Sequence, residues 1–361
     1  MNLRDIVRPI DNEMKDFKIK LRSSISSRNS LIDTVVSYIL KRKGKQIRPI
    51  FVFLTAGLNG KISDSTYRAA ILIEILHTAT LIHDDVVDDS NYRRGYFSIN
   101  ALWKSKYSVL IGDYLLSRGL ELSVQNNDFK FLGILSNAVK QMSEGEITQL
   151  KKSKSLDIDE DTYFKIIKEK TASLFSSCCM MGAISSNASE EKIKLMKKFG
   201  LLVGNAFQIR DDLFGYLSFD TGKPSLNDFK QGKITLPLIH SLSKVSSSTK
   251  RKIIKNLKNY RSIDEIIEFV KENKGIEYSE KIMIDMIEKA YSILNRFPDS
   301  KYRKSLYDLD SKFNNTMSLI AAYASQLSQA DDKQQQVDMS ALQQQIGQLQ
   351  QATSEHVKSS Q

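Results

Sequence analysis

Helical periodicity with very few proline interruptions constrains this chain most strongly. Only five prolines occur in 361 residues, and long proline-free stretches suit long helices because proline removes a helical hydrogen bond. Residues 66–88 are largely apolar and contain neither Gly nor Pro, and no strand-like alternation of polarity competes. The sequence therefore predicts an all-α fold. We expect helices over residues 66–88, 107–124, 128–150, 160–185, 190–217, 233–244, 249–258, 263–273 and 277–296.

The composition changes near residue 326. The first 325 residues contain six Gln, whereas the last 36 contain twelve and have no proline or aromatic residue. Within this part, Leu342, Ile346 and Leu349 recur at helical spacing. We expect one folded domain over residues 1–325, followed by a Gln-rich tail over 326–361 that is either flexible or a short helix.

The formal net charge of +11 makes a polyanionic ligand worth considering. The lysines are spread along helical segments and no nucleic-acid-binding motif is present, so we expect no nucleic-acid partner. Cys178 and Cys179 are adjacent, which fits a reduced cytoplasmic compartment better than a disulfide framework. The start of the chain lacks a signal-peptide pattern, and no stretch is a convincing membrane span.

The strongest local feature is an acidic run at the end of the apolar stretch, with Asp84, Asp85 and Asp88. Positions i and i+4 of a helix lie about 40° apart around its axis, so Asp84 and Asp88 point the same way. Carboxylates that converge beside apolar surface repel each other and require a cation. Oxygen-only ligands favour a hard ion such as Mg²⁺, which commonly bridges to substrate phosphates. An acidic helix end that faces water is the alternative.

A second acid pair, Asp211-Asp212, follows another apolar helical stretch. One such pair is weak evidence, whereas two with similar surroundings are much stronger. Two acid-bearing helices that face each other would hold metal ions between them and clamp a diphosphate.

Basic residues are interleaved with these acid pairs. Lys45 and Arg48 lie three residues apart, a spacing that places both on one helix face, where they can hold one anion. The further cations are Arg93, Arg94, Lys170, Lys223 and Lys233. Each alone reads as a surface residue, but together with two metal sites they indicate two separate diphosphate pockets.

In their order and spacing, these motifs resemble those of the trans-type polyprenyl diphosphate synthases over roughly residues 5–310. The matching motifs are Gly-Lys-x-x-Arg-Pro at 44–49, Asp-Asp-x-x-Asp at 84–88, Arg-Arg-Gly at 93–95, Gly112-Asp113-Tyr114, Lys170-Thr171, Phe207-Gln208, Asp211-Asp212 and Gly222-Lys223-Pro224. The resemblance implies an isoprenoid synthase-type bundle of antiparallel helices around a central cavity. It also implies that residues 1–325 form the catalytic domain and that the chain pairs as a homodimer.

The resemblance further implies roles for individual residues. Mg²⁺ would be bound by Asp84, Asp88 and Asp211, with Asp85 and Asp212 close behind. Isopentenyl diphosphate would be held by Lys45, Arg48, His77 and Arg94. The allylic diphosphate would be held by Arg93, Lys170, Lys223 and Lys233. Thr171 and Gln208 would flank the reacting carbons. The implied catalytic set is Asp84, Asp85, Asp88, Asp211, Asp212 and Lys170.

The implied reaction is a Mg²⁺-dependent condensation of isopentenyl diphosphate with an allylic diphosphate. Metal ions and lysines would stabilise the leaving diphosphate, and a dry apolar cavity would protect the allylic cation. The family's second motif usually ends in a further aspartate, but Gly215 stands there. Because of this departure, a second interpretation is that the chain is a non-catalytic subunit that works with a partner.

In this family, residues just before the first acid motif control product length, and large aromatic residues there close the cavity early. These positions hold Ala79 and Thr80, with Leu76 about one turn further down. Their small size implies a long product of heptaprenyl or octaprenyl length, as used for quinone side chains. The alternative is that Ala79 is a tight packing residue.

Two other classes of enzyme share part of this pattern. A short-chain farnesyl or geranylgeranyl diphosphate synthase shares the catalytic residues and differs only at the floor of the cavity. A terpene cyclase would not need Lys45, Arg48 and His77. A transient contact with a membrane during product release is a further hypothesis, because a long polyprenyl product is insoluble in water.

Overall fold

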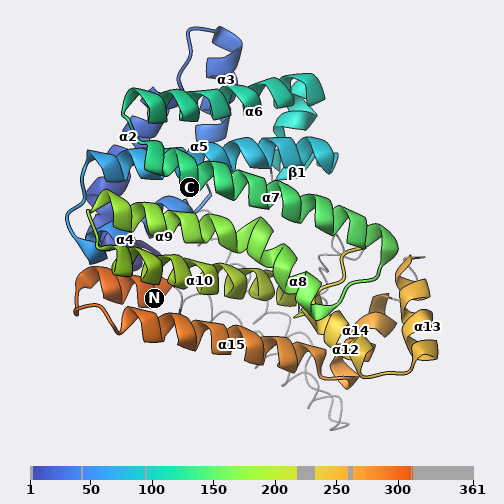
Figure 1. Cartoon of the computed structure of the whole chain (residues 1–361). Coiled ribbons are helices and arrows are strands. Elements are labelled where there is room, and N and C mark those ends of the chain that lie inside the picture. Colours follow the sequence, from blue (N-terminus) through green and yellow to red (C-terminus); the bar gives the residue numbers. More distant parts are fainter. Residues whose placement is uncertain are drawn as a thin grey trace, which may run out of the picture.

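The computed structural model describes residues 3–41, 44–93, 96–217, 232–258, 263–309 and 311, which are almost wholly helical (Figure 1). The first elements are α1 (Leu3–Val7), η1 (Arg8–Ile10), α2 (Asp11–Ile25), α3 (Ser30–Lys41) and α4 (Ile47–Asn59). The central elements are α5 (Asp64–Val87), α6 (Ile99–Gln125), α7 (Phe129–Ser155), α8 (Glu160–Ile167), the π-helical turn η2 (Lys168–Ala172), α9 (Ser173–Ser185) and α10 (Glu190–Leu217). The last elements are α12 (Leu236–Ser243), α13 (Ser247–Lys258), α14 (Ile263–Glu272), α15 (Gly275–Leu294) and a helix over 301–309.

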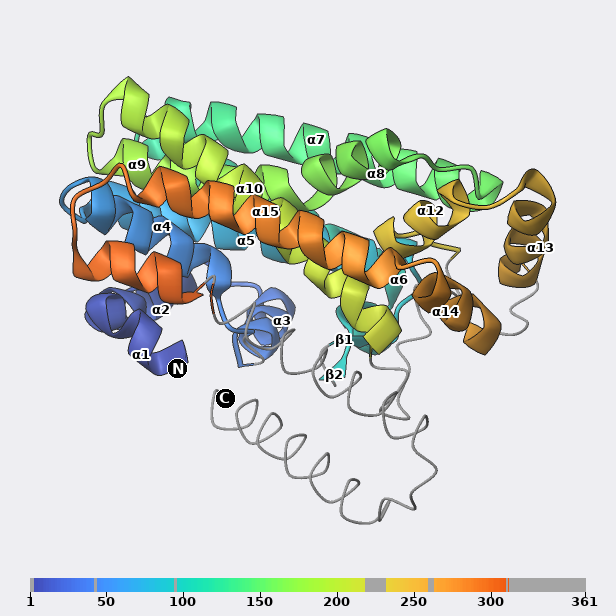
Figure 2. The ribbon, with the colours of Figure 1, turned by 90° about the horizontal axis from the view of Figure 1, so that it is seen from below.

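The long helices lie side by side and form a bundle (Figures 1 and 2). Helix α5 packs against α4, α6 and α9, and α10 packs against α9 and α15. Helix α9 is buried on almost every side, as its apolar residues all around the axis require. The aromatic side chains of Phe51, Phe53, Phe175 and Phe199 are fully buried at the centre of this core.

A second group of buried side chains occupies one end of the bundle. It joins α8, the second half of α10 and α12 to α15, and it includes Tyr163, Tyr216 and Leu236. Figures 1 and 2 agree in showing α8, α12, α13 and α14 together at this end. The second acid pair, Asp211-Asp212, lies on the part of α10 that meets here.

The predicted all-α class is confirmed, and each predicted helix is present; the ends of α10 match the prediction, and most of the others are shifted. Helices α1 to α4 precede the first predicted one and were not named from the pattern. The predicted helix 160–185 is interrupted by η2, where the amide of Ser173 donates to the carbonyl of Lys168, five residues back. Helix α6 begins earlier than predicted because it continues across a break at Lys104, whose φ is 66°.

One short β ribbon lies beside the helices, although no strand pattern in the sequence marked it. Strand β1 (Tyr92–Arg93) pairs antiparallel with β2 (Tyr96–Phe97), with Tyr92 opposite Phe97. Two residues per strand are too few for alternating polarity to appear in the sequence. The predicted tail at 326–361 lies outside the described residues.

Candidate active site

The first acid motif forms the last turn of α5. The amide of Asp88 donates to the carbonyl of Asp84 at 2.8 Å, so the helical spacing between these two residues is kept. Asp84 is partly buried and Asp88 is exposed, whereas Asp85 is only 3% exposed. Asp84 and Asp88 are therefore more accessible to solvent than Asp85, which lies between them in the sequence.

His83 anchors this turn to α6. Its Nε2 lies 3.3 Å from the carbonyl of Val109 and 3.6 Å from the Asp113 carboxylate. A Cβ at Gly112 would lie 2.1 Å from the same nitrogen, so the imidazole can lie here only over a glycine. Tyr114 donates its hydroxyl hydrogen to the carbonyl of Ser26 at 2.9 Å. The Gly112-Asp113-Tyr114 motif thus positions α6 against α2 and the acidic end of α5.

The second acid pair lies near the end of α10. Asp212 accepts hydrogen bonds from the hydroxyl of Tyr163 at 2.6 Å and from the Gln208 amide at 2.9 Å. Asp211 forms an ion pair with Arg210 at 2.6 Å. Burial and the charge of Asp212 raise the pKa of Tyr163 well above its ordinary value, so this hydroxyl remains a donor.

The two acid pairs share one pattern of exposure. The second carboxylate of each pair, Asp85 or Asp212, is buried at 3% or 7% exposed. The first carboxylates are more accessible, and the side chain of Asp211 is 43% exposed. The accessible first carboxylates are therefore the ones that an incoming ligand would meet.

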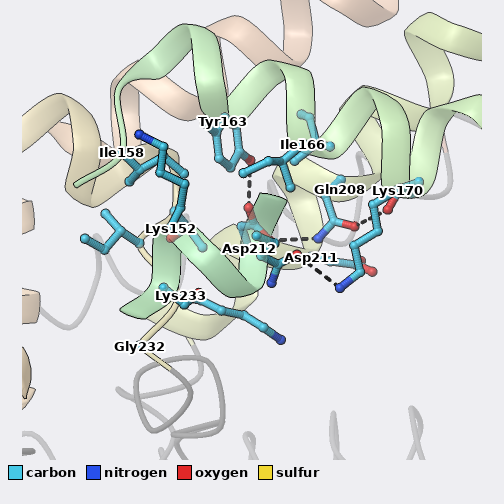
Figure 3. Close-up of a pocket in the computed structure, with 16 residues that line it drawn as sticks. Lys152, Ile158, Tyr163, Ile166, Lys170, Gln208, Asp211, Asp212, Gly232 and Lys233 are labelled. Atoms are coloured by element: carbon cyan, nitrogen blue, oxygen red, sulfur yellow. Dashed lines mark hydrogen bonds between the residues drawn. The ribbon is translucent and has the colours of Figure 1, made fainter. Parts of the chain in front are cut away.

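The Lys170 pocket is a cavity of about 220 Å³ beside the second acid pair. Lys170, Thr171, Gln208, Asp211, Asp212 and Lys233 are among its lining residues. Figure 3 shows the side chains of Lys170 and Lys233 reaching toward the space beside Asp211 and Asp212. With Lys152, which also lines it, this pocket combines three ammonium groups with two carboxylates, a set suited to a diphosphate and a divalent cation together.

Two side chains of α7 hold Lys170. Its ammonium group donates to Gln149 at 3.0 Å and forms an ion pair with Glu146. On the next residue, the Thr171 hydroxyl donates to the Gln208 carbonyl oxygen at 2.7 Å. The π-helical turn η2 thus directs neighbouring side chains of the predicted Lys-Thr motif into one site, as π turns often do at functional sites.

The Lys45 pocket, also about 220 Å³, lies between α3, α4 and α5. Lys45, Arg48, His77, Asp85 and Phe207 are among its lining residues. The prediction that Lys45 and Arg48 share a helix face is wrong. Gln46 has a left-handed φ of 48° and α4 begins only at Ile47, so Lys45 precedes the helix. Both cations nevertheless line the same pocket.

Electrostatics connect the two pockets. Burial and the positive charge of Arg210 lower the pKa of Lys45, and the charge of Asp211 partly offsets this effect. On α10, Phe207 lines the Lys45 pocket while Gln208 lines the Lys170 pocket. Among the described residues, those predicted for the two diphosphates therefore line two pockets that both include residues of one segment of α10.

Some predicted residues are not tested by this geometry. Arg94 and Lys223 lie outside the described residues, as does the side chain of Arg93. Ala79 and Leu76 are buried in the main core, and neither lines the Lys45 or Lys170 pocket. The Thr80 hydroxyl donates to the carbonyl of His77 at 2.9 Å. The chain-length assignment of these three α5 residues stays a prediction.

Sequence reasoning missed Tyr163, Glu146 and Gln149. Each contacts a predicted site residue through a hydrogen bond or ion pair. No local signal marks Tyr163 among the 14 tyrosines of the chain, because its partner Asp212 is 49 residues away. Such partnerships depend on how the helices pack.

The described residues contain no group of three or more His, Cys, Asp or Glu side chains arranged to hold a metal ion by themselves. Carboxylates are nonetheless the donors that Mg²⁺ prefers, and Mg²⁺ is usually bound by one or two of them together with waters and substrate phosphates. The donor chemistry of Asp84, Asp88 and Asp211 therefore fits such an ion. Within the described part of the chain, no helix has the length and apolar character needed to cross a membrane.

Comparison with known proteins identifies the family. A model of the polyprenyl synthetase family matches residues 29–273. Heptaprenyl diphosphate synthase component 2 of Bacillus subtilis is 32% identical over 299 residues, which cover 82% of this chain and 86% of that protein. Octaprenyl diphosphate synthase of Haemophilus influenzae is 31% identical over 315 residues, which cover 86% of this chain and 95% of that protein.

Solved structures have the same fold. A decaprenyl diphosphate synthase from Rhodobacter capsulatus superposes with a TM-score of 0.82 at 31% identity, covering 86% of this chain and 98% of the other. A polyprenyl synthase from Caulobacter crescentus, complexed with calcium and isoprenyl diphosphate, gives 0.77 at 31% identity, covering 85% and 96%. A geranylgeranyl pyrophosphate synthase from Bacteroides thetaiotaomicron gives 0.72 at 35% identity, covering 86% and 98%.

These likenesses identify an all-α isoprenoid synthase fold and the trans-prenyltransferase class of enzyme. The chain belongs to the polyprenyl synthetase family. The predicted family, fold class and enzyme class are therefore confirmed.

Proposed function

We propose that this chain condenses isopentenyl diphosphate with an allylic diphosphate, in a Mg²⁺-dependent reaction, to make a long-chain trans-polyprenyl diphosphate. The observation that carries this proposal is the presence of two cation-lined pockets on the two sides of residues 207–212. The Lys45 pocket would take isopentenyl diphosphate and the Lys170 pocket would take the allylic diphosphate. Two separate anion sites are what a condensation of two diphosphates needs, and a cyclase needs only one.

The metal ions would be held by the first carboxylates of the two pairs, Asp84 and Asp211, and by the exposed Asp88, with diphosphate oxygens completing the ligand set. When bound, Mg²⁺ would neutralise negative charge on the leaving diphosphate. The calcium and isoprenyl diphosphate bound by the Caulobacter crescentus relative support a divalent cation here. The buried Asp85 and Asp212 would orient their neighbours rather than bind the metal directly.

The protein's own groups would act by position and charge. Lys170 and Lys233 stabilise the diphosphate as the allylic C–O bond breaks and the electron pair leaves on oxygen. The double bond of isopentenyl diphosphate attacks the allylic cation, and a proton passes to the departing diphosphate. Thr171 and Gln208 flank the reacting carbons, and the apolar side chain of Phe207 helps to exclude water.

A long product is supported by the small residues Ala79 and Thr80 before the first acid motif and by the long-chain relatives. The geranylgeranyl pyrophosphate synthase relative keeps a short-chain product as the competing outcome. The length of the product is therefore a direct readout of this part of the proposal.

A homodimer is part of the proposal, supported by exposed apolar side chains on two neighbouring helices. Leu110, Leu120 and Val124 lie within about 80° of one another around the axis of α6 and are all exposed. Phe129 and Ile147 share one face of α7 and are also exposed. Apolar stripes of this kind typically mark an interface, and a second copy would cover both.

A cytoplasmic location is supported by the two cysteines, which are buried and unpaired with each other. Reduced thiols are typical of that compartment. A transient membrane contact for product release also belongs to the proposal, because a long polyprenyl chain is insoluble in water.

The test is incubation of the purified chain with farnesyl diphosphate, labelled isopentenyl diphosphate and Mg²⁺, followed by chromatography of the products. We expect a ladder that ends at one long polyprenyl diphosphate and disappears when EDTA is added. Lys45→Ala should raise the KM for isopentenyl diphosphate more than that for farnesyl diphosphate. A folded chain that incorporates no label would refute the proposal.

A partner-dependent subunit is the second candidate. It is favoured by Gly215 in place of the usual aspartate and by the Bacillus subtilis relative, which is a component 2. Turnover by the isolated chain excludes this candidate. Turnover that appears only after a second protein is added would support it.

A further inference from the structure

Tyr163 lines the Lys170 pocket from α8, although no motif marks it. Its side chain is buried at 3% exposed, and its hydroxyl donates to Asp212 Oδ2 at 2.6 Å. A short hydrogen bond from a neutral donor to a carboxylate is stronger than a neutral pair. Tyr163 is therefore well placed to fix the orientation of the Asp212 carboxylate.

The orientation of Asp212 determines that of Gln208. The other carboxylate oxygen, Oδ1, accepts from Gln208 Nε2 at 2.9 Å. Because an ionised carboxylate only accepts hydrogen bonds, the NH₂ group of Gln208 must face Asp212. The carbonyl oxygen of Gln208 therefore faces the opposite way, toward Thr171.

The orientation of Gln208 determines that of the Thr171 hydroxyl. Gln208 Oε1 accepts from Thr171 Oγ1 at 2.7 Å. A threonine hydroxyl has one hydrogen and two lone pairs. Since that hydrogen points to Gln208, the lone pairs are left for the pocket that Thr171 lines.

The three hydrogen bonds thus converge on Asp212, with Tyr163 donating from one side and Thr171 donating through Gln208 from the other. These hydrogen bonds link α8, α10 and η2, and the series ends with the Thr171 hydroxyl oxygen at the Lys170 pocket. Under the proposed function, positive charge develops on the allylic carbon in this pocket. A preorganised oxygen stabilises such charge, whereas a hydroxyl hydrogen turned toward it would oppose it.

We propose that Tyr163 is a positioning residue which, through Asp212 and Gln208, keeps the oxygen of Thr171 turned toward the reacting carbon. This inference rests on the proposed function. Tyr163 itself does not touch the reacting atoms. Its hydroxyl restricts the rotation of the Asp212 carboxylate. Through the hydrogen bonds of Gln208, this restriction also fixes the orientation of the Thr171 hydroxyl.

The test compares Tyr163→Phe with the unchanged chain in steady-state turnover. Loss of one hydrogen bond to a charged group should lower kcat about tenfold. The KM for the allylic diphosphate should stay within about twofold, because this series of hydrogen bonds acts on the transition state rather than on diphosphate binding. A raised KM with unchanged kcat would overturn the proposal.

Tyr278→Phe is the matched control. Tyr278 donates to Glu160 Oε1 at 2.7 Å, which is also a tyrosine–carboxylate hydrogen bond to α8, and it does not line the Lys170 pocket. Its kcat should stay within about twofold of the unchanged chain. Equal losses of kcat in Tyr163→Phe and Tyr278→Phe would reduce Tyr163 to a general structural role and refute the inference.

A double-mutant cycle with Thr171→Val tests the relay itself. If Tyr163 acts through Thr171, Tyr163→Phe should add less than about twofold to the loss in the Thr171→Val chain. Fully additive losses would overturn the proposal.

The same cycle separates this inference from the proposed function. If the unchanged chain gives no turnover, the proposed function fails, and the cycle is then measured in chemical unfolding. Coupling of at least about twofold in the unfolding equilibrium constant would support the hydrogen-bond relay. Independent effects of the two substitutions would refute it.

Discussion

Replacement of Gly204 by alanine tests how closely α10 approaches η2. A Cβ at Gly204 would lie 2.5 Å from Ala172 Cα and 2.9 Å from Ala172 Cβ. Non-bonded carbon atoms prefer about 3.5–4.0 Å, so the two segments must separate by about 1 Å. The atom in the way belongs to the backbone, which cannot rotate aside as the end of a long side chain could.

This separation would occur next to the reacting groups. Gln208 lies one helical turn beyond Gly204, and it accepts the hydrogen bond from Thr171 at 2.7 Å across the same two segments. A shift of about 1 Å in a catalytic group can lower the rate about 100-fold. Overpacking should cost about 1–3 kcal/mol in the free energy of unfolding, of which the better helix propensity of alanine offsets up to about 1 kcal/mol.

Gly133→Ala is the control for Gly204→Ala. A Cβ at Gly133, in the second turn of α7, meets no described atom within 4 Å beyond the neighbouring backbone of its own helix. This variant should be as active as the unchanged chain and more stable by up to about 1 kcal/mol. Urea unfolding and incorporation of labelled isopentenyl diphosphate measure the two quantities. If Gly204→Ala matches Gly133→Ala in both, the close approach of α10 to η2 is refuted.

Three other substitutions test separate parts of the site. A Cβ at Gly215 meets no described atom within 4 Å beyond the neighbouring backbone of its own helix, so an aspartate side chain should fit there. Gly215→Asp should lower the half-saturating Mg²⁺ concentration about tenfold. Gly215→Ala is the control, and equal Mg²⁺ dependence in the two variants would contradict a metal-binding role. Ala79→Tyr should shorten the product while it costs about 1–3 kcal/mol of stability by overpacking; a product of unchanged length on chromatography would leave Ala79 as a packing residue only. Burial lowers the pKa of Lys45, so its ammonium loses charge at a lower pH than an ordinary lysine. The KM for isopentenyl diphosphate should therefore rise as pH increases through that pKa, whereas Lys45→Arg should flatten the rise because a guanidinium stays charged; parallel pH profiles would exclude Lys45 as the titrating group.

Local patterns were sufficient for most helices and for the acid pairs. The period of apolar residues predicted α5 and α10, and the i, i+4 spacing predicted that Asp84 and Asp88 share one side of α5. The hydrogen bond from the Asp88 amide to the Asp84 carbonyl agrees with that spacing. These features depend on residues within one or two helical turns, so the sequence carries them without help from the rest of the fold.

Local patterns failed where a few backbone angles decided the outcome. The left-handed conformation at Gln46 removes Lys45 from the helix that contains Arg48. The π-helical turn divides a segment that has a continuous helical period. Neither residue type nor spacing distinguishes these conformations from an ordinary helical turn, because the energy differences between them are small compared with those of tertiary packing.

The amino-acid sequence alone was enough to establish the all-α class, the family and the residue types that would bind diphosphates and metal. Packing decided which of those residues became neighbours. It buried Asp85 and Asp212 while it left Asp211 accessible, and it brought Tyr163 to Asp212 across 49 positions of the chain. Helical periodicity is a property of neighbouring residues, whereas burial and partners at a site follow from the close fit of distant helices. That difference is why the chemistry could be predicted from the sequence, but the hydrogen-bond chain that orients it could not.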